Sequence, residues 1–379
     1  MSDKISTFFI SVGEPSGDIH AAKLVLSLKK ISPNIKFIGN GGDKMIEAGV
    51  NVKNHIDKMS IMGFVEVLKN YNSLSKIFKN TVSEIKTSKP DKILLVDYPG
   101  FNLRLVKKIK NLDIPITYFI LPQTWAWKEN RILFMKKTIS NFISIFPFET
   151  NWYNSKGLKT YYPGHPFLDN EYGRDKDNQF LKKHNLKNND SLLVLLPGSR
   201  QQEINYHWPI FLEIIFLLKN ELPSLRFCLV KSSNVIIKNI PDFIIIEPSA
   251  TNALKHGTAA ISSSGTVNLE CALAKVPTIV CYKTSYINWI IFKIFGKVDF
   301  ISIVNLIVEE KIIPEFIQNE MTSKKMLPHL LEYLLPSSKA RRETIEKYKN
   351  IRTKLGSPGV FDRAAKHIIS EKDNEKQIR

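Results

Sequence analysis

Short apolar runs alternate with stretches of helical periodicity over the first third of the chain. Runs rich in β-branched and aromatic residues predict strands at residues 8–12, 93–96, 116–120 and 143–146. Ahead of the second run, apolar residues recur at three- and four-residue steps and mark one face of a helix. They are Leu68, Tyr71, Leu74, Phe78, Val82 and Ile85. This alternation is typical of a parallel sheet covered by helices on both faces.

A polar stretch near residues 162–190 separates this half from a second cycle of the same kind. There, strands are predicted at residues 192–196, 227–230, 243–246, 259–261 and 278–281. We therefore predict an α/β protein with two facing Rossmann-like domains of doubly wound parallel sheet and a ligand cleft between them. The predicted domains are 1–168 and 169–348, followed by a charged helical segment, 349–379.

Length and charge narrow the class of protein. A chain of 379 residues exceeds the size of about 250–300 residues at which single cores stop growing, which favours two domains. With 54 basic and 36 acidic residues the formal charge is +18, so the surface attracts anions. The sequence has no zinc-finger ligand pairs, RNP motif or basic-region heptads. Phosphorylated ligands are therefore favoured over nucleic acid, and acidic lipid stays a candidate partner.

The cysteines and apolar runs bear on location. Cys228, Cys271 and Cys281 lie in apolar surroundings without metal-ligand spacing, as expected of buried thiols in the reducing cytoplasm. The first apolar run is too brief for a signal peptide. The most apolar later stretch, 289–295, contains Lys293 and is far shorter than the roughly 20 residues that cross a bilayer. We expect a cytoplasmic protein without a membrane span.

Two segments of the first half are candidates for chemistry. GEPSGD follows the first strand, so Ser16 and Gly17 lie where the backbone can approach a ligand, unless Ser16 or Asp18 caps the next helix. Asp97 follows the second strand at the carboxyl end, where open α/β sheets hold reactive groups, and suits a general base. Its alternative role is to cap a helix that begins near Asn102.

Aromatic and glycine-rich segments are less specific. Trp125 and Trp127 follow another strand and could stack on a sugar, contact lipid or pack in the core. His165, between Pro163 and Pro166, suits a hinge residue rather than a metal ligand. The glycine-rich segment 39–45 lacks the G-x-G-x-x-G order, and no Walker motif occurs. NAD binding and a P-loop NTPase are therefore disfavoured.

In the second half, LLPGSRQQEI places Ser199 and Arg200 at the end of a strand, with Glu203 early in the following helix. A guanidinium group at this point can hold a diphosphate and stabilise the charge that grows on it as a glycosidic bond breaks. The alternative is a surface arginine paired with Glu203.

The segment ISSSGTVNLECALAKVPTIV predicts a strand, a Ser/Gly turn, a helix and a second strand. The backbone amides of Ser264, Gly265 and Thr266 would point at a phosphate. Glu270 would then lie within reach of ribose hydroxyls, unless it is a solvated helical residue.

These segments together resemble the lipid-A-disaccharide synthase family, and the resemblance extends along nearly the whole chain. The matching segments are GEPSGD, GNGGDKM, IMGFVEVL, DYPGFNLRLVKKIK, WAWKENRI, FPFE, GHPFLD, LLPGSR with Glu203, SGTVNLECALAKVP and YKTSYINWIIFKIFGKVDFISIVNLI. The chain departs from the family where many members carry a second acid and it has Gly100, and where many carry Tyr and it has Phe300. Asp97 is kept, so a mechanism with one base is unaffected.

The resemblance implies a GT-B fold and an inverting glycosyl transfer that needs no metal or cofactor. A 2,3-diacylglucosamine unit would pass from UDP-2,3-diacylglucosamine to 2,3-diacylglucosamine 1-phosphate. Asp97 would activate the acceptor 6-hydroxyl, while Arg200, Ser199 and the amides of residues 264–266 would hold UDP. Glu270 and Asn305 would complete donor binding, and Ser16 and Gly17 would shape the floor of the cleft.

Both substrates of this reaction carry acyl chains, which implies peripheral association with the cytoplasmic face of the inner membrane. Lysine-rich composition would attract anionic headgroups, and an apolar group near Lys293 could enter the acyl boundary. The group comprises Trp289, Ile290, Ile291, Phe292 and Phe295. A packed interdomain or dimer helix explains the same residues, and a homodimer stays open. The resemblance also implies that the segment 349–379 packs back on an N-terminal domain, either its own or that of a partner. The rival functions are another UDP-sugar enzyme of this fold, such as a 2-epimerase or a peptidoglycan-type transferase, or a non-catalytic basic protein that binds membrane or nucleic acid.

Overall fold

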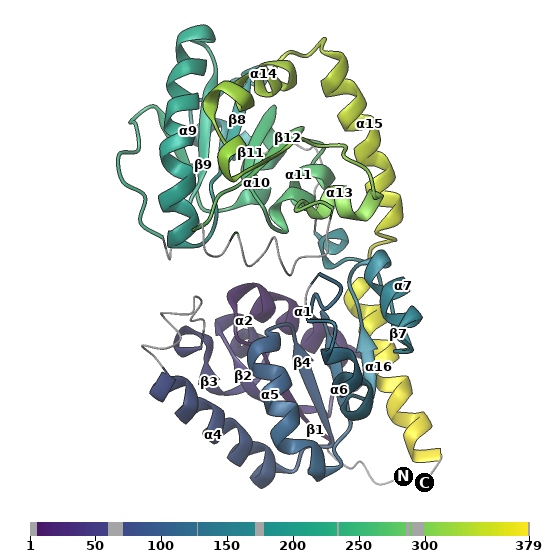
Figure 1. The fold of residues 1–379 in the computed structure, drawn as a ribbon. Helices are drawn as coiled ribbons and strands as arrows, with labels where there is room; N and C mark the ends of the chain where they lie inside the picture. The colour runs from purple at the N-terminus through teal and green to yellow at the C-terminus, as the bar shows by residue number, and fades with distance from the viewer. Residues whose placement is uncertain are drawn as a thin grey trace. The chain divides into compact units, whose positions relative to one another are not determined.

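The computed structural model describes residues 6–59, 71–126, 128–170, 178–232, 235–285, 289 and 299–377, with the backbone alone at 71 and 371–377. The chain forms two compact units (Figure 1). One contains Met1–Asp169 together with Leu355–Arg379, and the other contains Asn170–Lys354. Helix α15 (Lys339–Lys354) belongs wholly to the second unit, so the returning C-terminal segment begins at Leu355.

Unit 1 is built on a parallel sheet, which among the described residues has seven strands in the order β3-β2-β1-β4-β5-β6-β7. The strands are β1 (Thr7–Ser11), β2 (Lys36–Gly41), β3 (Asn51–His55), β4 (Lys92–Val96), β5 (Ile116–Phe119), β6 (Asn141–Ile143) and β7 (Thr160–Tyr161). Every residue of the central strand β4 is buried, as expected of a parallel sheet covered on both faces.

Helices cover this sheet, and proline begins several of them. The helices are α1 (Pro15–Ile31), α2 (Asp43–Glu47), α4 (Tyr71–Ser88), α5 (Pro99–Ile109), α6 (Arg131–Thr138), α7 (Pro147–Ser155) and α16 (Val360–Gln377), with the short 3-10 helices η1 (Ile56–Lys58), η2 (Lys110–Leu112) and η3 (Pro166–Asp169). Proline suits the first helical turn because its fixed φ matches the helix and no N–H is needed there.

The C-terminal helix α16, yellow in Figure 1, packs against α1. The carboxylate of Asp169 accepts hydrogen bonds from the amides of Gly359, Val360 and Phe361, at 2.5, 3.1 and 3.3 Å. A carboxylate at the start of a helix satisfies free N–H groups and complements the helix dipole. Asp169 therefore anchors the returning segment on unit 1.

Unit 2 repeats the architecture, with six described strands in the order β10-β9-β8-β11-β12-β13, all parallel. They are β8 (Leu192–Leu196), β9 (Arg226–Val230), β10 (Ile244–Glu247), β11 (Ala259–Ser263), β12 (Thr278–Tyr282) and β13 (Glu315–Ile317). The helices are α8 (Asn178–Lys183), α9 (Gln201–Glu221), α10 (Ala250–His256), α11 (Val267–Leu273), α13 (Ile303–Val308), α14 (Ser323–Leu334), α15, and the 3-10 helix η4 (Gln318–Glu320).

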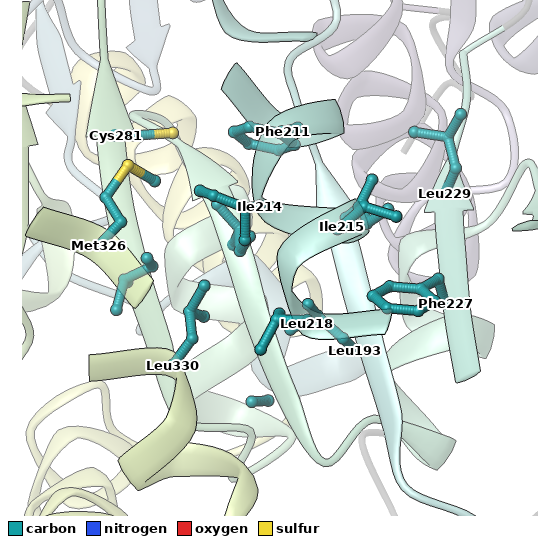
Figure 2. Packing of buried hydrophobic residues seen from close by; sticks show 14 of the residues in the cluster. Leu193, Phe211, Ile214, Ile215, Leu218, Phe227, Leu229, Cys281, Met326 and Leu330 are labelled. Carbon is teal, nitrogen blue, oxygen red and sulfur yellow. The ribbon is translucent and has the colours of Figure 1, made fainter. Parts of the chain in front are cut away.

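One hydrophobic core of unit 2 lies between its sheet and helices α9 and α14. Figure 2 shows Phe211, Ile214 and Leu218 of α9 directed at the strands, with Met326 and Leu330 of α14 beside them. Their near-complete burial gives about 25 cal/mol for each Å² of apolar surface removed from water. This packing sets the start of α9, and with it the loop that carries Arg200.

Most predicted strands are confirmed, and the exceptions have physical causes. The strand predicted at residues 143–146 is wrong in its bounds: β6 ends at Ile143, and Phe146 is the N-cap of α7. The prediction missed four strands. Strand β2 is interrupted by glycine, β3 is polar, and β7 and β13 have only two and three residues. No helix among the described residues is long and apolar enough to cross a bilayer.

Candidate active site

The two sheets share one strand order, in which the chain starts at an inner strand, winds to one edge and then returns to build the other side. The switch point lies between β1 and β4 in unit 1 and between β8 and β11 in unit 2. Ligands of open α/β sheets bind outside the carboxyl ends of strands at such a point. The segments that directly follow these four strands contain GEPSGD, Asp97, Arg200 and the turn 264–266. Within each unit, the fold therefore brings together motifs that are far apart in sequence.

Hydrogen bonds fix the backbone of Asp97 from three sides. Its N–H donates to the carbonyl oxygen of Phe119 at 3.1 Å. Its carbonyl oxygen accepts from Asn102 Nδ2 at 2.7 Å and from the Tyr118 hydroxyl at 2.8 Å. Asn102 also accepts a hydrogen bond from Ser11 Oγ at 2.8 Å, which ties the end of β1 to the same turn. These bonds leave the Asp97 side chain available for chemistry.

The turn at Asp97 is strained. Asp97 and Tyr98 both have φ of 49°, in the left-handed region that costs non-glycine residues about 1–3 kcal/mol. The Tyr98 ring packs against Gly13, where an added Cβ would lie 2.1 Å from the ring. Its hydroxyl donates to the carbonyl oxygen of Met59 at 2.7 Å. The loop after β4 and the loop after β1 are therefore in direct contact.

Helix α5 begins at Pro99, and its N-cap is Tyr98 without a side-chain capping bond. The alternative role for Asp97, a cap for a helix near Asn102, is therefore wrong. Burial raises the pKa of the Asp97 carboxyl group, and a hydrogen bond from the Tyr98 amide partly opposes this rise. A carboxylate with a raised pKa is a better proton acceptor near neutral pH. At Gly100, where many family members have an acid, an added Cβ would meet nothing within 4 Å.

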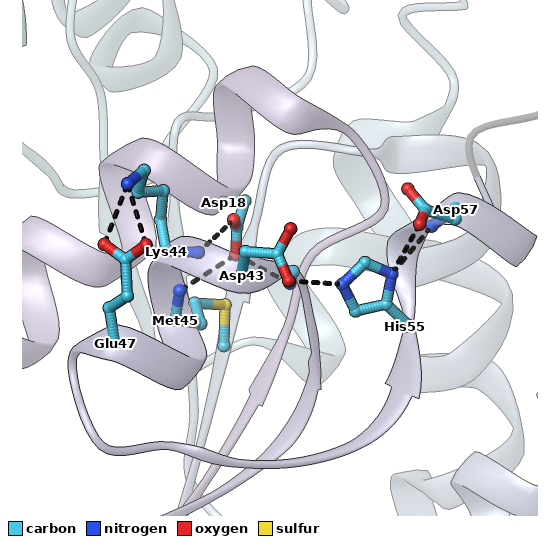
Figure 3. Close-up of polar contacts among 8 residues, drawn as sticks. Asp18, Asp43, Lys44, Met45, Glu47, His55 and Asp57 are labelled. Atoms are coloured by element: carbon cyan, nitrogen blue, oxygen red, sulfur yellow. Dashed lines mark hydrogen bonds and ion pairs between the residues drawn. The ribbon is translucent and has the colours of Figure 1, made fainter.

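GEPSGD does not cap its helix in the way that the alternative interpretation predicted. The N-cap of α1 is Glu14, without a side-chain bond, so neither Ser16 nor Asp18 caps this helix. Asp18 instead accepts from the amides at the start of α2, from Gly42 at 2.7 Å and from Lys44 at 3.0 Å, as Figure 3 shows for Lys44. Ser16 is exposed and Gly17 is buried beside Val12. The motif therefore joins two helices and leaves Ser16 at the surface of this edge.

A buried acid that the sequence analysis did not single out lies on the same edge. Glu149, in the first turn of α7, is 1% exposed. It accepts hydrogen bonds from Trp125 Nε1 at 2.8 Å and from Ser144 Oγ at 2.7 Å. Burial, and to a smaller degree the charge of Asp97, raises its pKa to about 7. Its position in FPFE, just after a strand, is the feature that could have revealed it.

In unit 2, Arg200 is the N-cap residue of α9 and its side chain is 55% exposed. Arg200 Nη1 lies 3.3 Å from Glu203 Oε1, so the pairing considered as the alternative is present. Glu203 also accepts from the Ser199 amide at 3.1 Å, and an added Cβ at Gly198 would lie 2.3 Å from this carboxylate. Solvent screens the exposed Arg200 side of this pair, although Glu203 is only 13% exposed. A pair screened in this way contributes about 1 kcal/mol, so an incoming diphosphate can displace Glu203 from Arg200.

His207 joins the Arg200 loop to the segment that follows β12, two strands away in the sheet. It is fully buried, with Nδ1 2.7 Å from the carbonyl oxygen of Pro197 and Nε2 3.0 Å from the amide of Lys283. Burial lowers its pKa. A neutral ring that donates from Nδ1 and accepts at Nε2 satisfies both partners. His207 therefore fixes the loops after β8 and β12.

In the turn after β11, some of the hydrogen-bonding groups are already used within the protein. The Ser264 amide donates to the carbonyl oxygen of Cys281 at 3.2 Å, and its hydroxyl donates to that of Ile301 at 3.0 Å. The Ser264 amide is therefore engaged within the protein, contrary to the expectation that it points at a phosphate. Gly265 is exposed, and an added Cβ there would meet nothing within 4 Å.

The other two residues predicted to bind the sugar-nucleotide donor, Glu270 and Asn305, differ in burial and in their hydrogen-bond partners. Glu270 is half-buried, and its Oε2 lies 3.3 Å from Thr251 Oγ1, so it is not a freely solvated residue. Asn305 is fully buried. Its Nδ2 donates to Ile313 O and Glu315 Oε1, at 3.0 and 2.8 Å, and its Oδ1 accepts from the amides of Ile312 and Ile313. The Asn305 amide thus has a structural role here, and its contact with the donor stays a prediction.

Several predictions cannot be followed in the structure. Trp127, Ile290, Ile291, Phe292 and Phe295 lie outside the described residues, as does the segment IMGFVEVL. Trp289 is described and half-buried, and its amide donates to Ser285 O at 3.0 Å. Within the described ranges, no cluster of three or more His, Cys, Asp or Glu could hold a metal ion.

Solved structures with this two-domain architecture include a UDP complex, a UDP-GlcNAc 2-epimerase and a glycosyltransferase, by their descriptions. The S. aureus MnaA–UDP co-structure aligns with a TM-score of 0.67 at 14% identity, over 96% of each chain. The UDP-GlcNAc 2-epimerase from Neisseria meningitidis bound to UDP-GlcNAc aligns with 0.63 at 14%, over 96% of this chain and 98% of the other. The glycotransferase of kitacinnamycin aligns with 0.61 at 12%, over 97% and 98%. The protein therefore has the GT-B fold of glycosyltransferases and related epimerases.

Sequence comparison narrows this class to one family. The family model for lipid-A-disaccharide synthetase matches residues 8–365. The lipid-A-disaccharide synthase of Coxiella burnetii (strain CbuG_Q212) is 31% identical, over 97% of this chain and 98% of the relative. That of Myxococcus xanthus is 32% identical over 95% and 96%, and synthase 1 of Legionella pneumophila (strain Paris) is 35% identical over 83% and 84%. The chain belongs to the lipid-A-disaccharide synthase family and is a glycosyltransferase of lipid A biosynthesis.

Proposed function

We propose that this enzyme transfers 2,3-diacylglucosamine from UDP-2,3-diacylglucosamine to O6 of 2,3-diacylglucosamine 1-phosphate. The products are the β-1,6-linked disaccharide 1-phosphate and UDP. Membership of the family supports the reaction. The observation that carries the catalytic assignment is the position of Asp97. Its carboxylate caps no helix, has a raised pKa and lies at the switch point of the unit 1 sheet.

In the proposed mechanism, Asp97 accepts the proton of the acceptor 6-hydroxyl as its oxygen attacks the anomeric carbon of the donor. The bond from that carbon to the UDP oxygen breaks on the opposite face, which inverts the configuration, and its electron pair leaves with UDP. The three hydrogen bonds to the backbone of Asp97 hold the base in place without using its carboxylate. One base suffices for this step, so Gly100 at the second acid position is compatible with it.

Unit 2 binds the donor in this proposal. Arg200 leaves Glu203 for the diphosphate and stabilises the charge that develops on UDP. The amides of Gly265 and Thr266 and the side chain of Ser199 contribute hydrogen bonds to the phosphates. Glu270, already held by Thr251, is the candidate partner of the ribose hydroxyls.

Acylated substrates require contact with a lipid surface, so we propose peripheral association with the cytoplasmic face of the inner membrane. The formal charge of +18 supports attraction to anionic headgroups, about 1 kcal/mol for each basic residue near the surface. Sedimentation with anionic vesicles tests this, and failure to bind even at low salt contradicts it.

The decisive assay measures UDP release from UDP-2,3-diacylglucosamine with and without 2,3-diacylglucosamine 1-phosphate, in the presence of EDTA. Release that depends on the acceptor and survives EDTA is the expected result. Release without the acceptor would indicate a different UDP-sugar reaction. If folded protein binds UDP but releases none from this donor, the proposed substrates are wrong.

A further inference from the structure

The side chain of His207 connects two segments of unit 2 that the strand order keeps apart. Strand β11 lies between β8 and β12 in the sheet. His207 Nδ1 lies 2.7 Å from the carbonyl oxygen of Pro197, directly after β8. On the other side of the ring, Nε2 accepts a hydrogen bond from the amide of Lys283, directly after β12, at 3.0 Å. One side chain therefore links the segments on both sides of β11.

The turn after β11 is bonded to the same part of β12. The Ser264 amide donates to the carbonyl oxygen of Cys281 at 3.2 Å. Cys281 is only two residues before Lys283, the residue whose amide is bonded to His207. A series of hydrogen bonds therefore leads from the loop after β8, through His207 and the end of β12, to the turn 264–266.

The His207 ring has little freedom in this position. It is fully buried, and its centroid lies 6.4 Å from that of Phe211 and 6.3 Å from that of Tyr282. Because Nε2 accepts an N–H group, it carries no proton, and the neutral ring therefore holds its proton on Nδ1, toward the Pro197 carbonyl oxygen. The ring thus fixes the distance between the two backbone groups that it joins.

The loop that begins at Pro197 is short and is held by the first turn of α9. Arg200 is the N-cap residue of this helix. The Ser199 amide donates to Glu203 at 3.1 Å, and an added Cβ at Gly198 would lie 2.3 Å from the same carboxylate. Such a loop cannot absorb a shift at one end. A displacement of the Pro197 carbonyl group should therefore also displace Arg200.

In the proposed function, both ends of this hydrogen-bond series hold the donor diphosphate, Arg200 at one end and the amides of Gly265 and Thr266 at the other. A diphosphate has a nearly fixed span, and a misplacement of about 1 Å in such a site can cost 10²-fold in rate. We propose that His207 is a positioning residue that sets the separation between Arg200 and the turn 264–266. It acts through these groups, because both of its ring nitrogens are already bonded within the protein. This inference rests on the function proposed above.

Two substitutions separate the two bonds of His207. Asparagine places an N–H group near the position of Nδ1 and can keep the bond to Pro197, whereas glutamine reaches the position of Nε2 and can accept from the Lys283 amide. The series needs both bonds, so His207→Asn and His207→Gln should each weaken UDP binding roughly 10- to 100-fold in calorimetry of the full-length protein. Uridine has no diphosphate, and its affinity should stay unchanged. His329→Asn, the same change at an exposed position in α14, is the matched control.

Steady-state kinetics provide a second readout. With UDP-2,3-diacylglucosamine as donor, both His207 variants should raise the donor KM and lower kcat, because Arg200 also stabilises the charge that develops on UDP. The KM for the acceptor should stay unchanged, since the proposed acceptor site lies at Asp97 in unit 1. Urea unfolding of each variant shows how much stability the substitution removes.

Three results would overturn the positioning role. The first is unchanged UDP affinity in both His207 variants, and the second is an equal loss of affinity for UDP and uridine. The third is a lower free energy of unfolding with an unchanged donor KM, which assigns His207 to stability alone. If the wild-type protein does not bind UDP, the proposed function fails together with this inference. Normal wild-type turnover with indifferent variants defeats the role of His207 alone.

Discussion

The indole Nε1 of Trp125 donates a 2.8 Å hydrogen bond to Oε1 of Glu149. Trp125 lies in the loop after β5, and Glu149 begins the helix that follows β6. Ser144 Oγ donates to the other carboxyl oxygen at 2.7 Å. One buried carboxyl group thus joins two adjacent loops at the edge of the sheet where Asp97 lies.

Glu149→Ala should destabilise unit 1. The substitution leaves the Trp125 N–H and the Ser144 hydroxyl without their acceptor, at about 1–3 kcal/mol for each buried group. Glu149→Gln keeps an acceptor of similar shape and should cost less. Urea unfolding at neutral pH measures both values. Equal stability of the alanine variant and the wild type would show that the two hydrogen bonds contribute nothing net.

The pH dependence of stability should also change in Glu149→Gln. Burial raises the pKa of Glu149 from 4.5 to about 7. Between these two pH values, the Glu149 carboxyl group is therefore more protonated in the folded state than in the unfolded state. Its contribution to stability is therefore fully present below pH 4.5 and is lost as the pH rises through about 7. The difference in unfolding free energy, wild type minus Glu149→Gln, should fall across this window. A constant difference would mean that Glu149 titrates normally.

Asp97→Asn should abolish most turnover and leave the fold intact. The bonds that fix Asp97 to Phe119, Asn102 and Tyr118 use its backbone, so they survive the change. Loss of a general base typically lowers kcat by about 10²–10⁴-fold. In the wild type, kcat/KM should fall as the pH drops through the raised pKa of Asp97. Arg200→Ala should likewise lose turnover without unfolding. Robust activity in either variant would contradict the catalytic role assigned to the substituted residue.

Two glycine substitutions in unit 1 should behave in opposite ways. Gly13→Ala places a Cβ 2.1 Å from the Tyr98 ring, so the ring must move and displace the Asp97 turn. We expect lower kcat together with lower thermal stability. Gly100→Asp enters open space near the start of α5, where a negative charge contributes about 0.3–1 kcal/mol of stability. Its kcat should stay close to that of the wild type, and a large gain would instead show that the second acid matters.

Asn305→Ala distinguishes a structural role from donor binding. The substitution removes every hydrogen bond of a fully buried amide, two of which hold the amides of Ile312 and Ile313. We expect a loss of stability of several kcal/mol, since each unpaired buried group costs about 1–3 kcal/mol. UDP affinity of the remaining folded protein is measured in the same sample. A stable variant with weak UDP binding would restore the predicted donor role.

The sequence by itself determined the α/β class, most strands, the place of Asp97 and Arg200 after their strands, and the family. These features depend on local rules: buried parallel strands are continuous apolar runs, and turns between strand and helix require particular residue types. For the same reason the polar edge strand β3 and the two-residue strand β7 were missed, because neighbouring strands rather than their own sequence hold them in place.

Only the tertiary structure decided the partners of each polar group. It gave Asp18 to the start of α2 and Glu149 to Trp125. It also showed that Asp97 caps no helix. Hydrogen bonds act over about 3 Å, whereas these partners are brought together by the order of strands in a sheet. A linear sequence fixes the residue types but not that proximity.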